Sequence, residues 1–307
     1  MKRIKLTVAY DGTDYCGWQI QPNGITVEEV LNRNLSELTG EEITVTGASR
    51  TDSGVHAQGN VAVFDSDTTI PPERIAYAVN RKLPEDIVVI RSEEVPGDWH
   101  PRYQETEKTY EYHILNREMP DPVRRRDTYF VSYPLDLEAM RRAAAYLKGE
   151  HDFRSFCNVH TDVQDTVRTI YDLDIIRSGD LVTVRIRGNG FLYNMVRIIV
   201  GTLVRVGRGF YSPGQVKEIL EAKERTSAGV TAPPGAGPCE DRLSGNGDMI
   251  RREDCAGPLF FLRKTSCRLT IHLYIVSINL TDRMPPYPGA SDWDYVIVGG
   301  DCHDQNL

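Results

Sequence analysis

Two series of periodic hydrophobic patterns set the main constraint on how this chain folds. In the first series, apolar and polar residues alternate over 4–8 and over 42–47, and Val61 and Val63 flank Ala62, which predicts three strands. Between the first two strands, residues 26–40 carry hydrophobic side chains at helical spacing, with Thr26 as the expected N-cap and Gly40 as the expected stop. This part of the chain is therefore predicted to run strand, helix, strand, turn, strand.

The second series repeats this mixture after residue 108. The expected elements are strands at 109–116, 167–176 and 181–190 and helices at 137–151 and 191–207. Neither series alternates strand and helix as a parallel βαβ sheet does. We therefore predict the α+β class, with antiparallel or mixed sheets flanked by helices.

The length of the chain and a break in its periodic pattern indicate two domains. The chain has 307 residues, more than the roughly 100 to 200 that are usual for one domain. Prolines and a basic cluster interrupt the pattern between residues 103 and 127. We expect an N-terminal domain over 1–103, which contains the loop 47–57, a C-terminal domain over 104–234, and an atypical tail over 235–307.

Charge and cysteine usage narrow the class of protein. The net charge of −8 argues against a partner held by overall positive charge, but it allows a local basic groove. No signal peptide and no membrane-length apolar run is visible, so we expect a cytoplasmic protein. The six cysteines form no C-x-x-C pair and no cysteine–histidine cluster, which predicts reduced thiols and no metal site.

The glycine-rich turn "GASRTDSGVHA", residues 47–57, carries the pattern most suggestive of chemistry. Its glycines would let the backbone approach a ligand, and Asp52 has cationic neighbours that favour an ionised carboxylate at neutral pH. Such a group can act as a nucleophile or as a base. The alternative is a simple polar loop in which Asp52 accepts backbone N–H bonds.

Several segments in a fixed order resemble the tRNA pseudouridine synthase A family. The turn resembles the catalytic-loop signature of that family, an R-T-D core followed by G-V-H-A. The other matching segments are "YDGTDYCGWQIQPNGITVEEVL", "WHPRYQETEKTYEYHI", "VRTI", "GNGFLYNMVRIIVGTLVRVGRG" and "AKERTSAGVTAPP". Together the matching segments span about residues 3 to 234.

The resemblance implies an activity, a partner and an architecture. The activity is isomerisation of uridine to pseudouridine in the anticodon stem-loop of tRNA, at positions 38, 39 and 40, without a cofactor or a metal. The enzyme would be a homodimer whose subunits together cradle one tRNA. The fold would be the two-domain pseudouridine synthase fold, with the active-site cleft between the domains.

The resemblance also assigns roles to a charged pair. Asp52 matches the catalytic carboxylate, which could attack the sugar at C1′, attack the base or remove a sugar proton. Arg197 matches the arginine that pairs with this aspartate, and a fixed guanidinium would keep the carboxylate ionised and oriented. Without the resemblance, Arg197 would be interpreted as a solvent-exposed helix residue.

Two further residues are candidates for binding the target nucleotide. Tyr110 matches a tyrosine that stacks on the uracil, although core packing is the alternative and Tyr112 shares its strand face. Arg50 matches an arginine that helps to extrude the target nucleotide, with a phosphate contact as the alternative. The basic clusters at 81–82 and 124–126 are candidate contacts to the RNA backbone, or simply solvated surface.

The tail departs from the family pattern. The family would end soon after Pro234 with an apolar strand, whereas residues 235–255 show no period and only 269–280 could be a strand. Residues 235–249 can be back-translated so that the next reading frame encodes "GLVLVKIDYPETEI" before a stop. We therefore hypothesise a frameshift, and we expect a second sheet without its last strand and a poorly packed tail.

Two other classes of protein are alternatives to the enzyme. One is an RNA-binding relative that is catalytically impaired because the altered C-terminus misplaces Arg197. The other is an aspartate-nucleophile hydrolase, which would need a metal-binding acidic pair near Asp52. Asp65 and Asp67 lie at the end of a predicted strand, and they lack the required pattern.

Overall fold

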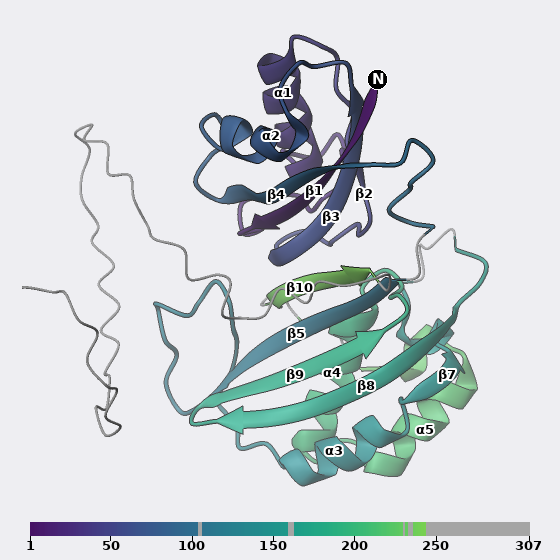
Figure 1. Ribbon diagram of the computed structural model, residues 1–307. Helices are drawn as coiled ribbons and strands as arrows, with labels where there is room; N and C mark the ends of the chain where they lie inside the picture. Colours follow the sequence, from purple (N-terminus) through teal and green to yellow (C-terminus); the bar gives the residue numbers. More distant parts are fainter. Residues whose placement is uncertain (104–105, 159–162, 230, 233–235, 244–307) are drawn as a thin grey trace, which may run out of the picture. The chain divides into compact units, whose positions relative to one another are not determined.

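The computed structural model describes residues 1–103, 106–158, 163–229, 231–232 and 236–243 (Figure 1). Within this part of the chain, helices and strands are mixed and the α+β prediction is confirmed. No helix among the described residues is long and apolar enough to cross a membrane.

The N-terminal half is a small antiparallel sheet with two helices against it (Figure 1). Its elements are β1 (Lys2–Tyr10), α1 (Val27–Thr39), β2 (Thr46–Gly47), β3 (Ala57–Ser66), α2 (Pro72–Val79) and β4 (Ile87–Val95). Strand β1 lies between β3 and β4 and is antiparallel to both. Side chains of α1 and α2 pack with those of β1, β3 and β4 into one hydrophobic cluster.

Helix α1 begins and ends where its local sequence predicts. The Thr26 hydroxyl accepts a hydrogen bond from the backbone N–H of Glu29 at 3.3 Å. Gly40 has a φ of 74°, in the left-handed region where glycine carries no steric cost, and its N–H donates to Ser36 O at 2.9 Å. Both caps are local, which is why the sequence alone located them.

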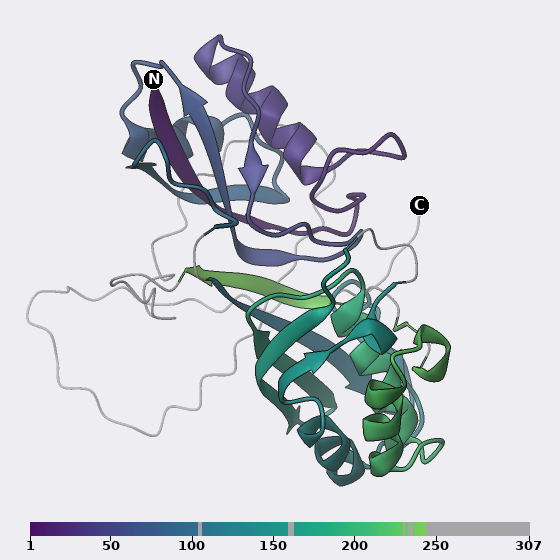
Figure 2. The ribbon, with the colours of Figure 1, turned by 90° about the vertical axis from the view of Figure 1, so that its right-hand side faces the viewer.

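The C-terminal half is a larger sheet, antiparallel except for the parallel pair β5 (Thr106–Asn116) and β6 (Tyr129–Val131), and its helices pack against one face (Figure 2). Its other elements are α3 (Leu137–Ala145), β7 (Gly149–Asp152), the short helix η1 (Arg154–Phe156), β8 (Val167–Ser178), β9 (Leu181–Gly188), α4 (Met195–Gly207), α5 (Pro213–Ala222) and the short helix η2 (Arg225–Ser227). A second hydrophobic cluster joins the three long helices to β5, β8 and β9.

Strand β10 (Ala236–Leu243) joins the two halves into one sheet. It runs parallel to β3 and antiparallel to β5, so the order is β4-β1-β3-β10-β5-β9-β8-β7. The expectation that the second sheet loses its last strand is therefore wrong, because residues 236–243 form a strand beside β5. The pairing depends on backbone groups, which form a ladder without any side-chain period.

Two helix boundaries differ from the sequence prediction. Helix α3 ends at Ala145 instead of residue 151, because residues 149–152 form strand β7, which pairs with β8. Helix α4 begins at Met195 instead of residue 191. The predicted strand at 269–280 lies outside the described residues, and the boundaries of the two domains stay a prediction.

Candidate active site

The loop 47–57 is held in place by the segment that follows β1. The backbone N–H of Trp18 donates to Thr51 O at 3.1 Å, and the Tyr10 and Thr51 hydroxyls are 2.7 Å apart. Gly17 has a φ of 84°, and a Cβ atom there would lie 2.5 Å from Thr51 O. Only glycine therefore fits beneath the backbone of this loop.

The Asp52 side chain lies beside residues from the start of α4. Arg197 Nη1 is 3.9 Å from Asp52 Oδ2, and the two side chains are 20% and 18% exposed. The backbone N–H of Asn194 faces the Asp52 carboxylate and favours its charged form. This carboxylate therefore contacts a distant segment, which is more than the polar-turn interpretation requires.

Arg197 is fixed from two sides. Its Nε donates to Ala232 O at 2.9 Å, and its Nη1 donates to Asn194 Oδ1 at 2.8 Å. In return, Ala232 N–H donates to Arg197 O at 3.1 Å. The segment after η2 thus positions the guanidinium, and Arg197 is not the freely exposed helix arginine of the alternative interpretation.

Burial dominates the electrostatics of Asp52. Desolvation raises the pKa of its carboxyl to about 6, although Arg197 and the Asn194 N–H both favour the charged form. The carboxylate is still mainly ionised at neutral pH. The arginine only partly offsets burial, however, and the raised pKa leaves Asp52 more basic than an exposed aspartate.

Tyr110 and Tyr112 point to the same face of β5 but differ in exposure. Tyr112 is 1% exposed within the larger hydrophobic cluster, and burial raises the pKa of its hydroxyl. Tyr110 is half-buried, packs against both clusters and meets the Phe191 ring edge-on at 5.1 Å between centroids. Of the two, Tyr110 has the surface that a stacked base would need.

Cationic side chains surround the first part of the loop. Arg102 Nε donates to Gly47 O at 2.9 Å, and Lys108 Nζ donates to Ser49 Oγ at 2.7 Å. Arg50 is exposed, and burial together with the positive charge of Arg50 lowers the pKa of Arg102. A negatively charged ligand at this position would relieve the repulsion between the two guanidinium groups.

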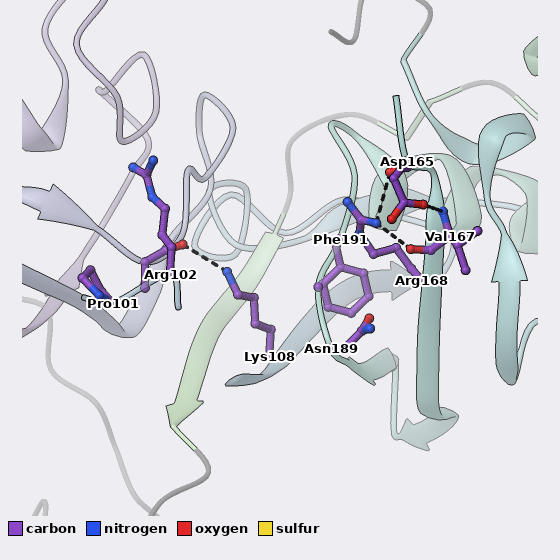
Figure 3. Close-up of a pocket in the computed structure, with 10 residues that line it drawn as sticks. Pro101, Arg102, Lys108, Asp165, Val167, Arg168, Asn189 and Phe191 are labelled. Atoms are coloured by element: carbon purple, nitrogen blue, oxygen red, sulfur yellow. Dashed lines mark hydrogen bonds between the residues drawn. The ribbon is translucent and has the colours of Figure 1, made fainter. Parts of the chain in front are cut away.

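A polar pocket of about 430 Å³ lies next to these cations (Figure 3). Arg102 and Lys108 line it together with Arg168, Asn189 and Phe191. Figure 3 shows Lys108 reaching from β5 toward the loop, while Arg168 donates to main-chain oxygens of its own segment. Positive charge beside an aromatic ring suits a nucleic-acid strand.

The end of the loop is anchored by His56. Its Nδ1 is 2.9 Å from Asp11 Oδ1, and its Nε2 is 3.1 Å from Arg126 O. Arg126 in turn lies 3.9 Å from Asp11 and 4.0 Å from Asp14. Arg125 Nη1 also donates to Pro122 O at 3.0 Å, so two arginines of the 124–126 cluster are engaged within the protein. RNA contacts by this cluster and by 81–82 stay a prediction.

The acidic pair considered for a hydrolase is engaged elsewhere. Asp65 binds Arg3 through both oxygens, at 2.7 and 2.6 Å, and Asp67 pairs with the N-terminal amine at 2.6 Å. Among the described residues, no group of three or more His, Cys, Asp or Glu side chains could hold a metal ion. The observed partners of this pair give no support to the hydrolase alternative.

Sequence reasoning missed Asn194, Ala232 and His56 as parts of the site. Asn194 precedes a helix and tolerates a left-handed backbone, a local signal that could have identified it. Ala232 contributes only backbone atoms, so its side chain gives no signal. His56 is isolated from other histidines and cysteines in the sequence, and its partners meet it only in the fold.

Comparison with known proteins identifies close relatives. A family model described as tRNA pseudouridine synthase matches residues 6–104 and 143–237. The tRNA pseudouridine synthase A of Thermoanaerobacter sp. (strain X514) is 49% identical over 234 residues, 76% of this chain and 96% of the relative. That of Halalkalibacterium halodurans is 51% identical over 234 residues, 76% of this chain and 89% of the relative. The tRNA pseudouridine synthase A 2 of Clostridium perfringens is 46% identical over 243 residues, 79% of this chain and 99% of the relative.

Proposed function

This chain belongs to the tRNA pseudouridine synthase family and is a uridine isomerase of tRNA, and on that premise we propose that Asp52 is its catalytic carboxylate. We further propose that it acts on uridines of the anticodon stem-loop, at positions 38, 39 and 40, as a cytoplasmic homodimer. The observation that supports the role of Asp52 is its burial beside a guanidinium that two hydrogen bonds hold in place.

The reaction needs a carboxylate that is both ionised and reactive. The N1–C1′ bond breaks, the base turns, a C5–C1′ bond forms, the C5 hydrogen leaves as a proton and N1 gains one. With a pKa of about 6, Asp52 is charged at neutral pH yet more basic than an exposed aspartate. It can therefore attack C1′, attack the base or remove a sugar proton, and Arg197 orients it for any of these steps.

The remaining side chains fit substrate binding. Tyr110 offers a half-buried ring on which the uracil can stack, and Arg50 extends from the same loop as Asp52. The cations around the loop can bind phosphates that flank the target nucleotide once it has left its stack. We assign Arg50 to extrusion of that nucleotide.

The competing interpretation is an RNA-binding relative without activity. This interpretation requires that Arg197 is misplaced. Arg197 lies 3.9 Å from Asp52, and this placement favours the enzyme. A chain with the site geometry intact is expected to turn over its substrate.

Tritium release tests the proposal directly. A tRNA transcript with tritium at uracil C5 must release that hydrogen to water when the new C–C bond forms. We expect release by the wild-type protein, none by Asp52→Ala with tRNA binding retained, and unchanged release by Asp67→Ala, an exposed aspartate outside the site. Release should also disappear when uridines 38, 39 and 40 are replaced by cytidine.

Three results would contradict the proposed function. Binding without release by the wild-type protein would favour the RNA-binding relative, and full release by Asp52→Ala would remove Asp52 from the chemistry. Release that survives the cytidine replacements would move the target away from the anticodon stem-loop.

A further inference from the structure

Asn194 adopts an unusual backbone conformation directly before helix α4. Its φ is 61° and its ψ is 7°, and it is one of two non-glycine residues with positive φ in the described chain. A left-handed conformation costs free energy in residues with a Cβ atom, although asparagine bears that cost best. Such a conformation at a candidate active site suggests a function for the residue that adopts it.

Three groups of Asn194 have distinct partners. Its carbonyl accepts the N–H of Ile198 at 3.0 Å, the first hydrogen bond of α4. Its N–H faces the Asp52 carboxylate and favours the charged form, and its side-chain oxygen accepts from Arg197 Nη1 at 2.8 Å. Asn194 therefore contacts both members of the Asp52–Arg197 pair and ties them to the helix.

The distance between Arg197 and Asp52 is longer than that of a direct hydrogen bond. Charge-assisted N–H···O bonds are about 2.7 to 2.9 Å long, whereas Arg197 Nη1 lies 3.9 Å from Asp52 Oδ2. Arg197 is held back by Asn194 Oδ1 at one nitrogen and by Ala232 O at another. Without the Asn194 side chain, Nη1 would lose an acceptor, and the Asp52 carboxylate is close enough to replace it.

We propose that Asn194 is a positioning residue that holds Arg197 at ion-pair distance from Asp52 but outside hydrogen-bonding distance, so that a carboxylate oxygen stays free to react. This inference rests on the proposed role of Asp52. A direct hydrogen bond from Arg197 would stabilise the carboxylate and make it a poorer nucleophile and base. The groups that face Asp52 are Arg197 and the Asn194 N–H, both from the start of α4, and Tyr112 of β5 faces Arg197 in turn.

Two substitutions separate the side chain of Asn194 from its backbone. Asn194→Gly keeps the left-handed backbone and the N–H but removes the acceptor for Arg197. Asn194→Asp keeps an acceptor and tolerates the same backbone, but it adds a negative charge near Asp52. Lys223→Gly is the matched control, because Lys223 is the other described non-glycine residue with positive φ, at 54°, and it is exposed.

The first readout is the titration of Asp52 itself. The carboxyl carbon of Asp52 can be followed by carbon-13 NMR in protein labelled at aspartate, with its signal assigned by Asp52→Asn. We expect the midpoint to fall by about one pH unit or more in Asn194→Gly, because the guanidinium closes on the carboxylate. In Asn194→Asp it should rise, because a like charge disfavours ionisation, and in Lys223→Gly it should not move.

The second readout is kinetic. Asn194→Gly should lower kcat at pH 7 by roughly tenfold or more with little change in KM, as expected when a substitution affects a transition-state interaction. The acidic limb of the pH–rate profile should move down in Asn194→Gly and up in Asn194→Asp. A residue with a purely structural role would change thermal stability without these opposite shifts.

The outcomes separate this inference from the proposed function. Loss of release in Asp52→Ala together with unchanged titration and kcat in Asn194→Gly would overturn the role of Asn194 alone. A rise of the Asp52 titration midpoint in Asn194→Gly would also overturn the role of Asn194, because Arg197 would then have moved away from the carboxylate. Full release by Asp52→Ala would sink the proposed function, while the NMR titration would still decide whether Asn194 sets the distance.

Discussion

Arg197 Nη1 lies 3.9 Å from Asp52 Oδ2, close enough for ionic attraction and too far for a hydrogen bond. The two residues come from different halves of the chain. Asp52 belongs to the loop that precedes β3, and Arg197 belongs to α4 in the larger hydrophobic cluster. Their approach therefore depends on the packing of both halves, and it leaves a buried carboxylate that its cation only partly compensates.

Burial of Asp52 should cost the protein stability at neutral pH. Its folded pKa of about 6 lies above the ordinary aspartate value of 3.8, so the folded state binds more protons between these two values. Stability should accordingly fall as the pH rises through this window and stay lower above it. At pH 7 the raised pKa lowers the free energy of unfolding by about 2 to 3 kcal/mol. Asp52→Asn should regain most of this stability at pH 7.5 but little at pH 4.

Urea unfolding of both proteins at the two pH values would check this prediction. Asp67→Asn, at an exposed and ion-paired position, serves as the control. An equal gain for Asp52→Asn at pH 4 and pH 7.5 would show that the effect does not come from ionisation of the carboxyl.

The two tyrosines of β5 should separate binding from stability. Tyr110→Ala should lower kcat/KM because the stacking surface is removed. Expressed as a free energy, the loss should be about 1 to 3 kcal/mol. Tyr112→Ala should instead lower the free energy of unfolding by about 3 to 5 kcal/mol, as large buried aromatic truncations do. Single-turnover kinetics and thermal unfolding of both variants would show this division, and the reverse pattern would move the stacking role to Tyr112.

The cations beside the loop should contribute to the salt dependence of tRNA binding. Removal of one side chain that binds a phosphate should reduce the slope of log K against log salt by about 0.7 to 0.9. We expect this for Arg102→Gln and Arg50→Gln, and no change for Arg91→Gln, whose guanidinium pairs with Glu93 on strand β4.

Kinetics at saturating tRNA would then separate the two interpretations of Arg50. A role in nucleotide extrusion predicts a lower kcat for Arg50→Gln. A phosphate contact alone predicts weaker binding with kcat unchanged.

Strand β10 should contribute strongly to stability because it is hydrogen-bonded on both sides. A chain that ends at Pro234 lacks the strand, whereas a chain that ends at Leu243 keeps it, so their difference in unfolding free energy measures its contribution. We expect the shorter chain to be less stable by several kcal/mol, since it exposes unpaired backbone groups of β3 and β5. Equal stability of the two chains would contradict the observed pairing, and sequencing of the gene would separately test the frameshift hypothesis.

The sequence by itself determined the elements whose causes are local. Hydrophobic period and caps located α1, because Thr26 and Gly40 act within one turn of the helix. The motif around Asp52 and the helix around Arg197 identified the family, because each can be recognised without knowing where the other lies.

Only the tertiary structure decided how these parts combine. The pairing of β10 with β3 and β5 depends on backbone groups that carry no side-chain signal. The raised pKa of Asp52, the greater exposure of Tyr110 compared with Tyr112 and the place of Asn194 beside Asp52 and Arg197 depend on burial and on distances between remote segments. Periodicity and capping act over a few residues, whereas desolvation and charge pairing depend on which surfaces the whole fold brings together.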